Sequence, residues 1–460
     1  MRRHIFSRKL IFLLALAVFI LFSACTKPTP TIRIPTSPET LPPTPTPTES
    51  TAVPTPPVLQ STASDLIPVQ TFDDSSSPFC QSQVDLTKSG GLAFVCADGN
   101  FTFLTPPWTK DIYKYLRVSV PIRPSAAFTI EADLTSWGVL GNPDQNNYGF
   151  IFGIDNTHTY SLRFKGDYYR LEKNLLMNNS NAEEGNIHIS QTWNRNYSPS
   201  FKSTGSTNHI QLTCIGKFCD LNINQNLAAR FNLDQEINAS SIALFAEVGY
   251  YKPFGSVDVD NLHVFLPSEN AVTKNGFAFS DSLVSDKGTF PKTGLSGAYN
   301  KYQADGFHFS SVVPFGYHEV LTDPALGDVS ISASVVLKPD TNNSPMYAGL
   351  VCRSSMEGMY FAVIRESGYF LIFRDTPTRP FFLLVEARSK EILSGGAANR
   401  LRLDCVGSTI TFYINGKKVA SLQDDQFKLV FGQNGFFTKA GKNPGETTIT
   451  FSDLEINEVR

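Results

Sequence analysis

The sequence predicts an all-β protein with two tandem β-sandwich domains, which follow a signal peptide and a disordered linker. Apolar and polar residues alternate with a period of two along much of the chain after residue 65, as in 128–135, and this pattern is typical of half-buried strands. No stretch of that region shows the period of an amphipathic helix. A segment of 31 residues recurs 191 positions later, so we expect two similar domains.

The composition is compatible with such domains and excludes other classes of protein. The 460 residues are 41% apolar and include 36 Phe, which is enough for one or two hydrophobic cores and too much for a globally disordered chain. Acidic residues outnumber basic residues by 42 to 39, and by 42 to 35 when residues 1–24 are left out. Because nucleic-acid-binding proteins normally have a basic face, we expect no nucleic-acid partner.

The first 24 residues have the pattern of a secretory signal peptide. Four basic residues lie within 2–9, an unbroken apolar run covers 10–22, and the small residues Ser23 and Ala24 follow. The apolar run of 13 residues is shorter than the roughly 20 that a membrane-spanning helix needs. We therefore expect residues 1–24 to direct secretion.

The segment from Leu21 to Cys25 resembles the lipobox of bacterial lipoproteins, although Phe22 stands where Leu is usual. This resemblance implies that Cys25 is acylated and becomes the first residue of the mature chain. The lipid bilayer would then be a partner, because acyl chains hold a protein to it. The resemblance also implies a place in the bacterial cell envelope, with the folded part on the extracytoplasmic side. An ordinary signal peptide followed by an incidental Cys is the alternative.

Residues 25–64 are expected to hold the lipidated Cys and a disordered tether. The segment 26–60 contains 11 Pro and 10 Thr. Proline lacks a backbone donor and restricts φ, so helices and sheets are disfavoured and polyproline II is the expected conformation. Such a tether would hold the folded part away from the membrane. A Pro-rich ligand for SH3-like domains is the alternative, but a cell exterior rarely supplies such partners.

The folded part is expected to contain two copies of one domain. Residues 205–235 align without a gap with residues 396–426, and ten of the 31 positions are identical. A repeat of this length indicates two whole domains, since the repeats of solenoid proteins are shorter. We place the copies at 65–266 and 275–460, with a short polar linker at 267–274.

A hairpin and a closing strand characterise the second copy. Residues 399–407 lead into two strands around Asn415 and Gly416, a strong hairpin signal, and residues 447–454 form the closing strand. The first copy has weaker equivalents, with Gln225 in place of the turn Gly. These segments resemble the concanavalin A-like lectin/glucanase jelly roll in its laminin-G-like form. The resemblance covers nearly all of the folded part and implies two jelly-roll β-sandwiches, but it does not specify a ligand.

Six of the seven cysteines remain once Cys25 is assigned to the lipid anchor, and secretion favours disulfides. In the second copy, two cysteines on core strands have no other candidate partner. In the first copy, two cysteines flank a four-residue turn and can face each other across a hairpin. The expected bridges join Cys80 to Cys96, Cys214 to Cys219 and Cys352 to Cys405. Buried free thiols are the alternative. No paired CxxC occurs, so we expect no zinc site.

Glucanases of the resembled family use three carboxylates at alternate positions of one strand. The nearest match here is Glu131 and Asp133, but the third position is Thr135. We therefore assign no catalytic residue, expect no enzyme activity, and interpret both carboxylates as the outward face of a strand. A sandwich-fold, sugar-processing enzyme of the glycoside hydrolase type is the alternative, and retaining enzymes of that kind need two carboxyl groups ~5 Å apart.

Members of the laminin-G-like family often hold one Ca²⁺ at a loop edge, so Ca²⁺ is a possible cofactor. The candidate oxygen ligands are Asp155, Asp258 and Asp260. Calcium takes six or more oxygen ligands, and the sequence does not bring that many together. We therefore assign no metal ligand.

Ligand binding is favoured over catalysis because one loop combines the residues that sugar recognition requires. The loop 191–200 holds flat aromatic rings beside amide and guanidinium groups, and functional residues concentrate on loops. The candidate ligand-binding residues are Trp193, Asn194, Arg195, Tyr197, Tyr168, Tyr250 and Tyr251. Filling of a Phe-rich core is the alternative role for the aromatic residues. The second copy has residues 379–382 instead, which we expect to be a strand entering the core.

The sequence thus predicts a cell-surface lipoprotein with two non-catalytic, lectin-like domains. The expected ligands are glycans, such as a polysaccharide, or other extracellular ligands such as proteins. Two linked sites would raise the apparent affinity for a repetitive ligand. A structural spacer or a protein-interaction module without a groove is a further alternative.

Overall fold

The structure of this chain is a computed structural model. The described residues are 65–70, 72, 77–81, 93–97, 99–104, 114–137, 147–153, 158–175, 188–192, 196–203, 205–248, 255–268, 276–290, 294–295, 298–311, 316–337, 346–425, 429–441 and 447–460. The predicted signal peptide, Cys25 and the tether lie outside them, as do most of the residues of the predicted linker. Across the described residues there are strands and turns and no α-helix. A search of the same residues finds no helix with the length and hydropathy needed to span a membrane.

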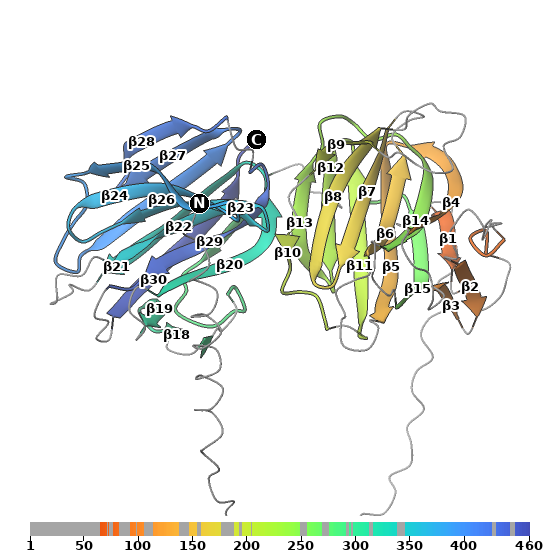
Figure 1. Ribbon diagram of the computed structural model, residues 1–460, viewed down its shortest axis with the longest axis horizontal. Coiled ribbons are helices and arrows are strands. Elements are labelled where there is room, and N and C mark those ends of the chain that lie inside the picture. The colour runs from red at the N-terminus through yellow and green to blue at the C-terminus, as the bar shows by residue number, and fades with distance from the viewer. Residues whose placement is uncertain are drawn as a thin grey trace, which may run out of the picture. The chain divides into compact units, whose positions relative to one another are not determined.

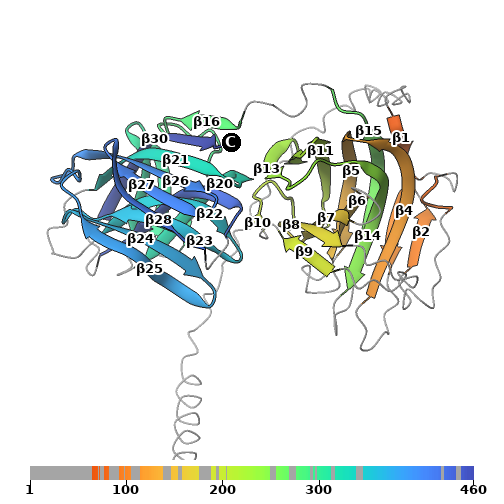
Figure 2. The ribbon, with the colours of Figure 1, turned by 90° about the horizontal axis from the view of Figure 1, so that it is seen from above.

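The first sandwich consists of two antiparallel sheets in separate layers (Figures 1 and 2). The first, called the β5 sheet, has the order β2-β3-β15-β5-β11-β12-β13, and β1 pairs with β15. Its strands are β1 (Asp65–Gln70), β2 (Ala93–Ala97), β3 (Asn100–Leu104), β5 (Ala127–Trp137), β11 (Thr207–Ile215), β12 (Phe218–Ile223), β13 (Asn226–Asn232) and β15 (Ser256–Phe265).

The second sheet of this sandwich, called the β7 sheet, has the order β10-β8-β7-β6-β14-β4, and β9 pairs with β8. Its strands are β4 (Lys114–Ser125), β6 (Asn147–Gly153), β7 (His158–Lys165), β8 (Tyr168–Leu175), β9 (His188–Thr192), β10 (Asn196–Tyr197) and β14 (Ala239–Val248).

The second sandwich is built in the same way from two antiparallel sheets. The β21 sheet has the order β17-β18-β19-β30-β21-β26-β27-β28, and β16 pairs with β30. Its strands are β16 (Ala278–Asp281), β17 (Gly294–Leu295), β18 (Ala298–Gln303), β19 (Gly306–Ser311), β21 (Val329–Leu337), β26 (Ala398–Val406), β27 (Thr409–Ile414), β28 (Lys417–Gln423) and β30 (Thr447–Glu458).

The β22 sheet of the second sandwich has the order β20-β29-β22-β23-β24-β25. Its strands are β20 (Tyr317–Leu326), β22 (Tyr347–Ser355), β23 (Gly358–Ile364), β24 (Tyr369–Thr376), β25 (Arg379–Arg388) and β29 (Gly432–Lys439). A parallel contact between Ala229 of β13 and Ala325 of β20 joins this sheet to the β5 sheet.

Each sandwich has a hydrophobic core to which both of its sheets contribute. The first core includes Phe128, Leu212, Phe150 and Leu162, and the second includes Ile331, Leu403, Leu350 and Ile372. All of these side chains are fully buried. Burial of one such side chain stabilises the fold by roughly 1.5–3 kcal/mol, so the two layers are held together by many additive contributions. The structure is therefore all-β and of the sandwich type, as the sequence predicts.

The alternation within β5 determines which residues reach the core. Ile130, Ala132 and Leu134 are buried, whereas Glu131 and Asp133 between them are only partly buried and face outward. Successive side chains of a strand point to opposite faces of the sheet, which explains this division. The outward placement predicted for the two carboxylates is confirmed.

The predicted hairpin around Asn415 and Gly416 is present and joins β27 to β28. Both residues have positive φ, at 50° and 79°, as a two-residue hairpin turn of type I′ requires. The side-chain oxygen of Asn415 accepts a hydrogen bond from the backbone N–H of Arg400 at 2.8 Å. Its amide group donates to Asn399 at 3.0 Å. The Asn thus ties the hairpin turn to the neighbouring strand β26.

Three disulfides join Cys80 to Cys96, Cys214 to Cys219 and Cys352 to Cys405, which are the pairs expected from the sequence. Cys214 and Cys219 face each other across β11 and β12. Cys352 lies on β22 and Cys405 on β26, so that bridge connects the two sheets of the second sandwich. Closing these loops restricts the unfolded chain and thereby stabilises the fold.

Residues 379–382 are a strand, as expected, but they do not enter the main core of the second sandwich. Phe381 has a positive φ of 51° and packs against Phe361 and Phe437 on the outer face of the β22 sheet. Phe382 is 37% exposed, and the guanidinium of Arg379 lies 4.8 Å from its ring centre. The irregular register of β24 and β25 explains the difference, because it breaks the simple alternation of faces.

Candidate functional site

The outer face of the β7 sheet carries a group of charged side chains. On β7, Leu162 and Phe164 are buried in the core, and the alternation of the strand therefore turns Arg163 and Lys165 to the opposite face. The antiparallel register places Arg163 directly across from Arg170 of β8. Like charges in that position repel each other unless acids accompany them.

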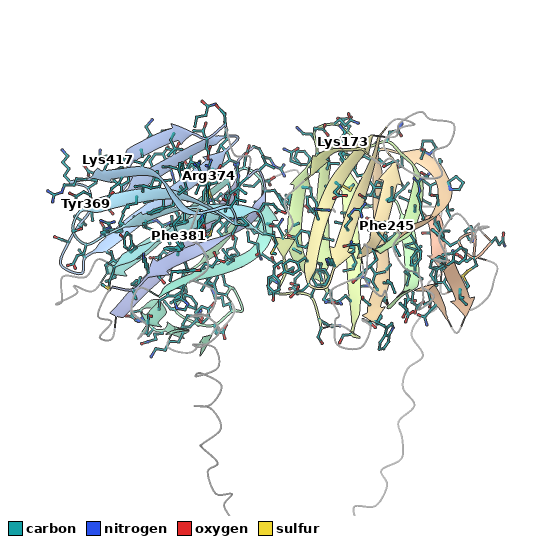
Figure 3. The ribbon with its side chains drawn as sticks, in the orientation of Figure 1. Lys173, Phe245, Tyr369, Arg374, Phe381 and Lys417 are labelled. Atoms are coloured by element: carbon teal, nitrogen blue, oxygen red, sulfur yellow. A yellow bond between two sulfur atoms is a disulfide. The ribbon has the colours of Figure 1, made fainter. Side chains whose placement is uncertain are left out.

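Two glutamates supply that compensation. The Nε–H of Arg163 donates to Glu172 at 2.5 Å, and a second N–H donates to Glu247 of β14. Arg170 also pairs with Glu172, whose side chain is fully buried. The guanidinium of Arg163 lies 5.0 Å from the ring centre of Phe245, which Figure 3 labels in the first sandwich. The contacts hold Arg163 in one orientation.

A cavity of about 150 Å³ opens beside this network. It is lined by Asn147, Arg163, Phe164, Lys165, Tyr168, Tyr169 and Arg170. Arg170 is the more accessible of the two arginines, since its side chain is 35% exposed against 11% for Arg163. The cavity is smaller than the ~300–1,000 Å³ of typical small-molecule sites. A ligand would therefore place one group in the cavity and lie with the rest on the open sheet.

Two tyrosines lie at the edge of the same face. Tyr168 of β8 and Tyr197 of β10 are cross-strand partners, and their rings meet edge to face with centres 6.0 Å apart. Tyr197 is 43% exposed. The pKa of Tyr197 is raised, first by burial and then by the negative charge of Asp167. Its phenol therefore stays protonated at physiological pH and can donate a hydrogen bond.

The structure brings together two of the residues singled out from the sequence. Tyr168 and Tyr197 share one face, and Tyr168 also lines the cavity. The remaining candidates, Trp193, Asn194, Arg195, Tyr250 and Tyr251, lie outside the described residues.

Sequence reasoning missed the charged residues of this face. Arg163, Glu172 and Glu247 come from three different strands, and only the sheet order places them side by side. A partial signal exists in the sequence, because Arg163 and Lys165 occupy the polar positions of an alternating strand. That signal marks an exposed face but does not show which other strands share it.

The carboxylates considered for catalysis lie elsewhere, on the outer face of the β5 sheet. His209 Nδ1 is 2.9 Å from Asp133, and the side-chain amide of Asn261 donates to the same carboxylate at 2.8 Å. The hydrogen bond from His209 is the main reason that the pKa of Asp133 is lowered. Glu131 lies 3.3 Å from His263 Nδ1. Both carboxylates therefore belong to a network of strand-face side chains.

The candidate calcium ligands are only partly described. Asp155 lies outside the described residues. Asp258 accepts hydrogen bonds from the Thr102 hydroxyl at 2.8 Å and from the Trp137 indole at 2.5 Å. Within the described part of the chain, no three His, Cys, Asp or Glu side chains come close enough together to hold a metal ion. A Ca²⁺ site stays a prediction from the resemblance.

The corresponding face of the second sandwich has a different character. On the outer face of the β22 sheet, Val351, Phe361 and Phe437 form a small buried apolar cluster, with Phe381 packed against it. Phe361 and Phe437 stack with ring centres 4.3 Å apart. Figure 3 labels Phe381 in this sandwich. The two outer faces thus differ, because the first carries a network of charged side chains and the second is centred on a small apolar cluster.

Comparison with known proteins finds structural likenesses at low identity. No protein-family model and no curated protein sequence matches the chain. A carbohydrate binding module from Bacillus subtilis is 13% identical, covering 37% of this chain and 96% of that module, with a TM-score of 0.30. A protein of unknown function with a galectin-like fold, also from Bacillus subtilis, is 14% identical, covering 40% and 97%, with a TM-score of 0.33.

Domains LG4-5 of the mouse laminin alpha1 chain are 9% identical, covering 81% of this chain and 90% of that one, with a TM-score of 0.23. These likenesses concern the fold and carry no information about a ligand of this chain.

Proposed function

We propose that this chain is a lipoprotein of the bacterial cell surface with two non-catalytic, lectin-like domains that arose by duplication. Cys25 anchors it in the bilayer, the Pro-rich tether spaces the folded part from the membrane, and the first sandwich binds a glycan on the outer face of the β7 sheet. The sequence pattern of residues 1–64 supports the anchor and the tether, and the repeated segment supports the duplication.

The observation that carries the binding proposal is the juxtaposition of the tyrosine pair with the arginine-lined cavity. Sugar rings have flat apolar faces that pack on aromatic rings, and hydroxyl groups that need hydrogen-bond partners at defined positions. Tyr168 and Tyr197 supply the aromatic surface. Arg170 supplies guanidinium donors at the cavity, and Glu172 holds that guanidinium in place. A pre-oriented donor loses little conformational freedom on binding.

The test is a glycan array with the full chain in detergent and its disulfides intact. We expect specific binding that falls at least tenfold when Tyr168 and Tyr197 are both changed to Ala, and when Arg170 is changed to Ala. A tenfold loss corresponds to ~1.4 kcal/mol of binding free energy. Tyr317→Ala is the matched control, because Tyr317 is an exposed tyrosine of the second sandwich.

A blank array from a folded protein would contradict the proposal and favour a spacer or a protein-interaction module. Binding that survives the three substitutions on the β7 sheet would place the glycan site elsewhere. Release of shortened sugars from a bound glycan would favour the sugar-processing alternative.

A further inference from the structure

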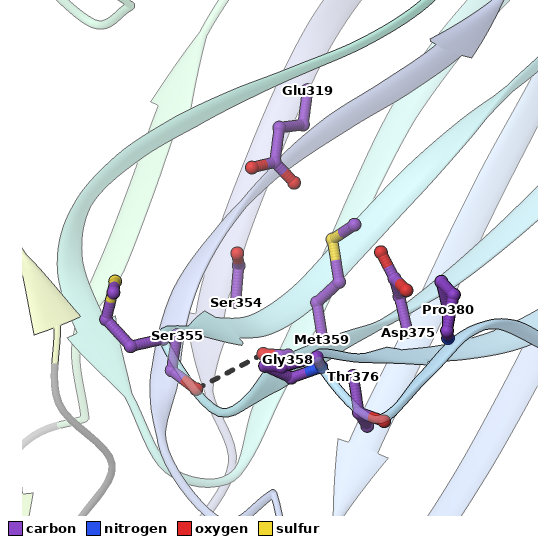
Figure 4. A pocket seen from close by; sticks show the side chains of 10 residues that line it. Glu319, Ser354, Ser355, Gly358, Met359, Asp375, Thr376 and Pro380 are labelled. Atoms are coloured by element: carbon purple, nitrogen blue, oxygen red, sulfur yellow. Dashed lines mark hydrogen bonds between the residues drawn. The ribbon is translucent and has the colours of Figure 1, made fainter. Parts of the chain in front are cut away.

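The second sandwich holds a cavity of about 310 Å³ at one end of the β22 sheet, shown in Figure 4. Glu319 of β20 and Asp375 of β24 line it from two sides. These two strands are separated in the sheet by β29, β22 and β23, so the carboxylates converge only through the curvature of the folded sheet. The volume is at the lower end of the ~300–1,000 Å³ range of small-molecule sites.

The two carboxylates lack a cationic partner in the described structure. The side chain of Glu319 makes no hydrogen bond or ion pair with any described residue, and the side chain of Asp375 accepts one hydrogen bond, from the backbone N–H of Phe381 at 3.0 Å. No Lys, Arg or His side chain belongs to the described lining of the cavity. Glu319 is an exposed residue of β20, yet the protein around its carboxyl group still raises its pKa, first by partial desolvation and then through the negative charge of Asp375. A cation placed between the two would relieve this repulsion.

The rest of the lining is apolar or carries hydroxyl groups. Met356 is 41% exposed, and Met359 lies between the two carboxylates in Figure 4. Methionine offers a soft, polarisable surface, and it adapts to the shape of what packs on it. Ser354 and Thr376, both buried, add hydroxyl groups to the lining. The cavity therefore matches a ligand that combines a positive charge, an apolar face and several hydroxyl groups.

We propose that this cavity binds an amine-bearing sugar unit of a glycan, with the protonated amine between Glu319 and Asp375 and the apolar face of the ring against Met356 and Met359. The proposal rests on the proposed function in taking the ligand to be a glycan. It assigns a second site whose charge preference is opposite to that of the arginine-lined cavity. The cavity is open to solvent rather than enclosed, which suits a ring lying across it better than the slender side chain of a lysine-bearing peptide.

The probes are three β-1,4-linked oligomers of equal length that differ only at carbon 2 of each ring. They are oligomers of glucosamine, of N-acetylglucosamine and of glucose, which carry an amine, an acetamide and a hydroxyl group. Binding to the full chain is measured by calorimetry at mildly acidic pH, where the amine is protonated. We expect the glucosamine oligomer to bind at least tenfold more tightly than the other two. We also expect added salt to weaken its binding, since salt screens charge pairs.

The decisive variants are Glu319→Gln and Asp375→Asn, which keep side-chain shape and remove one charge each. Either should abolish the preference for the amine. Glu366→Gln is the matched control, since it removes one negative charge from the same sandwich outside the cavity and should leave the preference unchanged. Equal binding of the three oligomers, or a preference that survives Glu319→Gln, overturns the proposal. The proposal is also overturned if tetralysine binds in a way that depends on Glu319 and the glucosamine oligomer does not bind.

Failure here is distinguishable from failure of the proposed function. If the glycan array is positive and depends on Arg170, which lines only the cavity of the first sandwich, but no amine preference depends on Glu319, only the second site is wrong. If the array is blank and none of the three oligomers binds, the glycan-binding function itself is wrong.

Discussion

At the scale of single residues, His209 and Asp133 form a pair whose strength depends on pH. The pKa of His209 is raised, chiefly by its hydrogen bond to Asp133, and the same bond chiefly lowers the pKa of Asp133. A raised histidine pKa stabilises the fold below its unfolded value of about 6.5, and that stability is lost as the pH rises through the folded pKa. A lowered aspartate pKa stabilises the fold above about 3.9, and that stability is lost as the pH falls through the folded value. The pair therefore contributes most between these two limits.

We predict that His209→Gln flattens the pH dependence of stability in the first sandwich. The wild-type protein should become easier to unfold as the pH rises above ~6.5, because the stability that protonated His209 contributes is lost as the pH passes from its unfolded value to its higher folded pKa. The variant should lack this slope. The measurement is the urea midpoint from tryptophan fluorescence, since Trp108, Trp137 and Trp193 all belong to the first half of the chain. His318→Gln is the control, because His318 lies in the second sandwich and burial lowers its pKa. An unchanged slope in His209→Gln would contradict the prediction.

At the scale of elements, the two sandwiches use the same hairpin with different turn residues. The turn between β12 and β13 consists of Asn224 and Gln225, with φ of 50° and 71°, close to the values of Asn415 and Gly416. The side-chain oxygen of Asn224 accepts a hydrogen bond from the backbone N–H of His209 at 3.0 Å. Gln225 thus occupies a left-handed conformation that disfavours residues with a Cβ by ~1–2 kcal/mol.

We predict that Gln225→Gly stabilises the first sandwich by about 0.5 kcal/mol, because relief of the left-handed conformation exceeds the ~0.5–1 kcal/mol entropic loss of a glycine. The reverse change, Gly416→Gln, should destabilise the second sandwich by a similar amount. Urea unfolding gives both values, with fluorescence for the first variant and far-ultraviolet circular dichroism for the second. Effects of the same sign in the two variants would show that turn strain is not the cause.

At the scale of the whole molecule, two cores and separate disulfides give each sandwich its own sources of stability. The Cys352–Cys405 bridge closes a loop with a sequence separation of 53 and connects the two sheets of the second sandwich. The Cys214–Cys219 bridge spans 5 residues within one hairpin of the first. In the chain-entropy model these loops contribute ~4 and ~2 kcal/mol, since a longer loop restricts the unfolded chain more.

We predict that changing Cys352 and Cys405 to Ala lowers the stability of the second sandwich by at least ~4 kcal/mol, because the loop constraint is lost and two buried sulfurs are removed. Circular dichroism of the full chain should then show an unfolding transition at lower urea. The tryptophan fluorescence midpoint should stay near the wild-type value. Changing Cys214 and Cys219 to Ala should instead lower the tryptophan fluorescence midpoint, by a smaller amount, and leave the unfolding transition of the second sandwich near its wild-type position. If the fluorescence midpoint moves together with the circular dichroism midpoint in the first variant, the two sandwiches unfold as one unit.

The sequence by itself determined the all-β class, the hairpin at Asn415 and Gly416, and the three cysteine pairs. These features depend on local order along the chain: strand periodicity acts over a few residues, a turn over two, and the cysteines had few alternative partners. It also pointed to Tyr168 and Tyr197, which prove to be neighbours across adjacent strands.

Only the tertiary structure decided which side chains share a face. Arg163 on β7 reaches Glu247 on β14 across the single intervening strand β6. Glu319 and Asp375 line one cavity although three strands lie between theirs in the sheet. Period-two alternation assigns each residue to one of two faces, but it does not reveal the order of strands within a sheet. That order is set by long crossovers and by the packing of one sheet on another, so both cavities become visible only in the folded molecule.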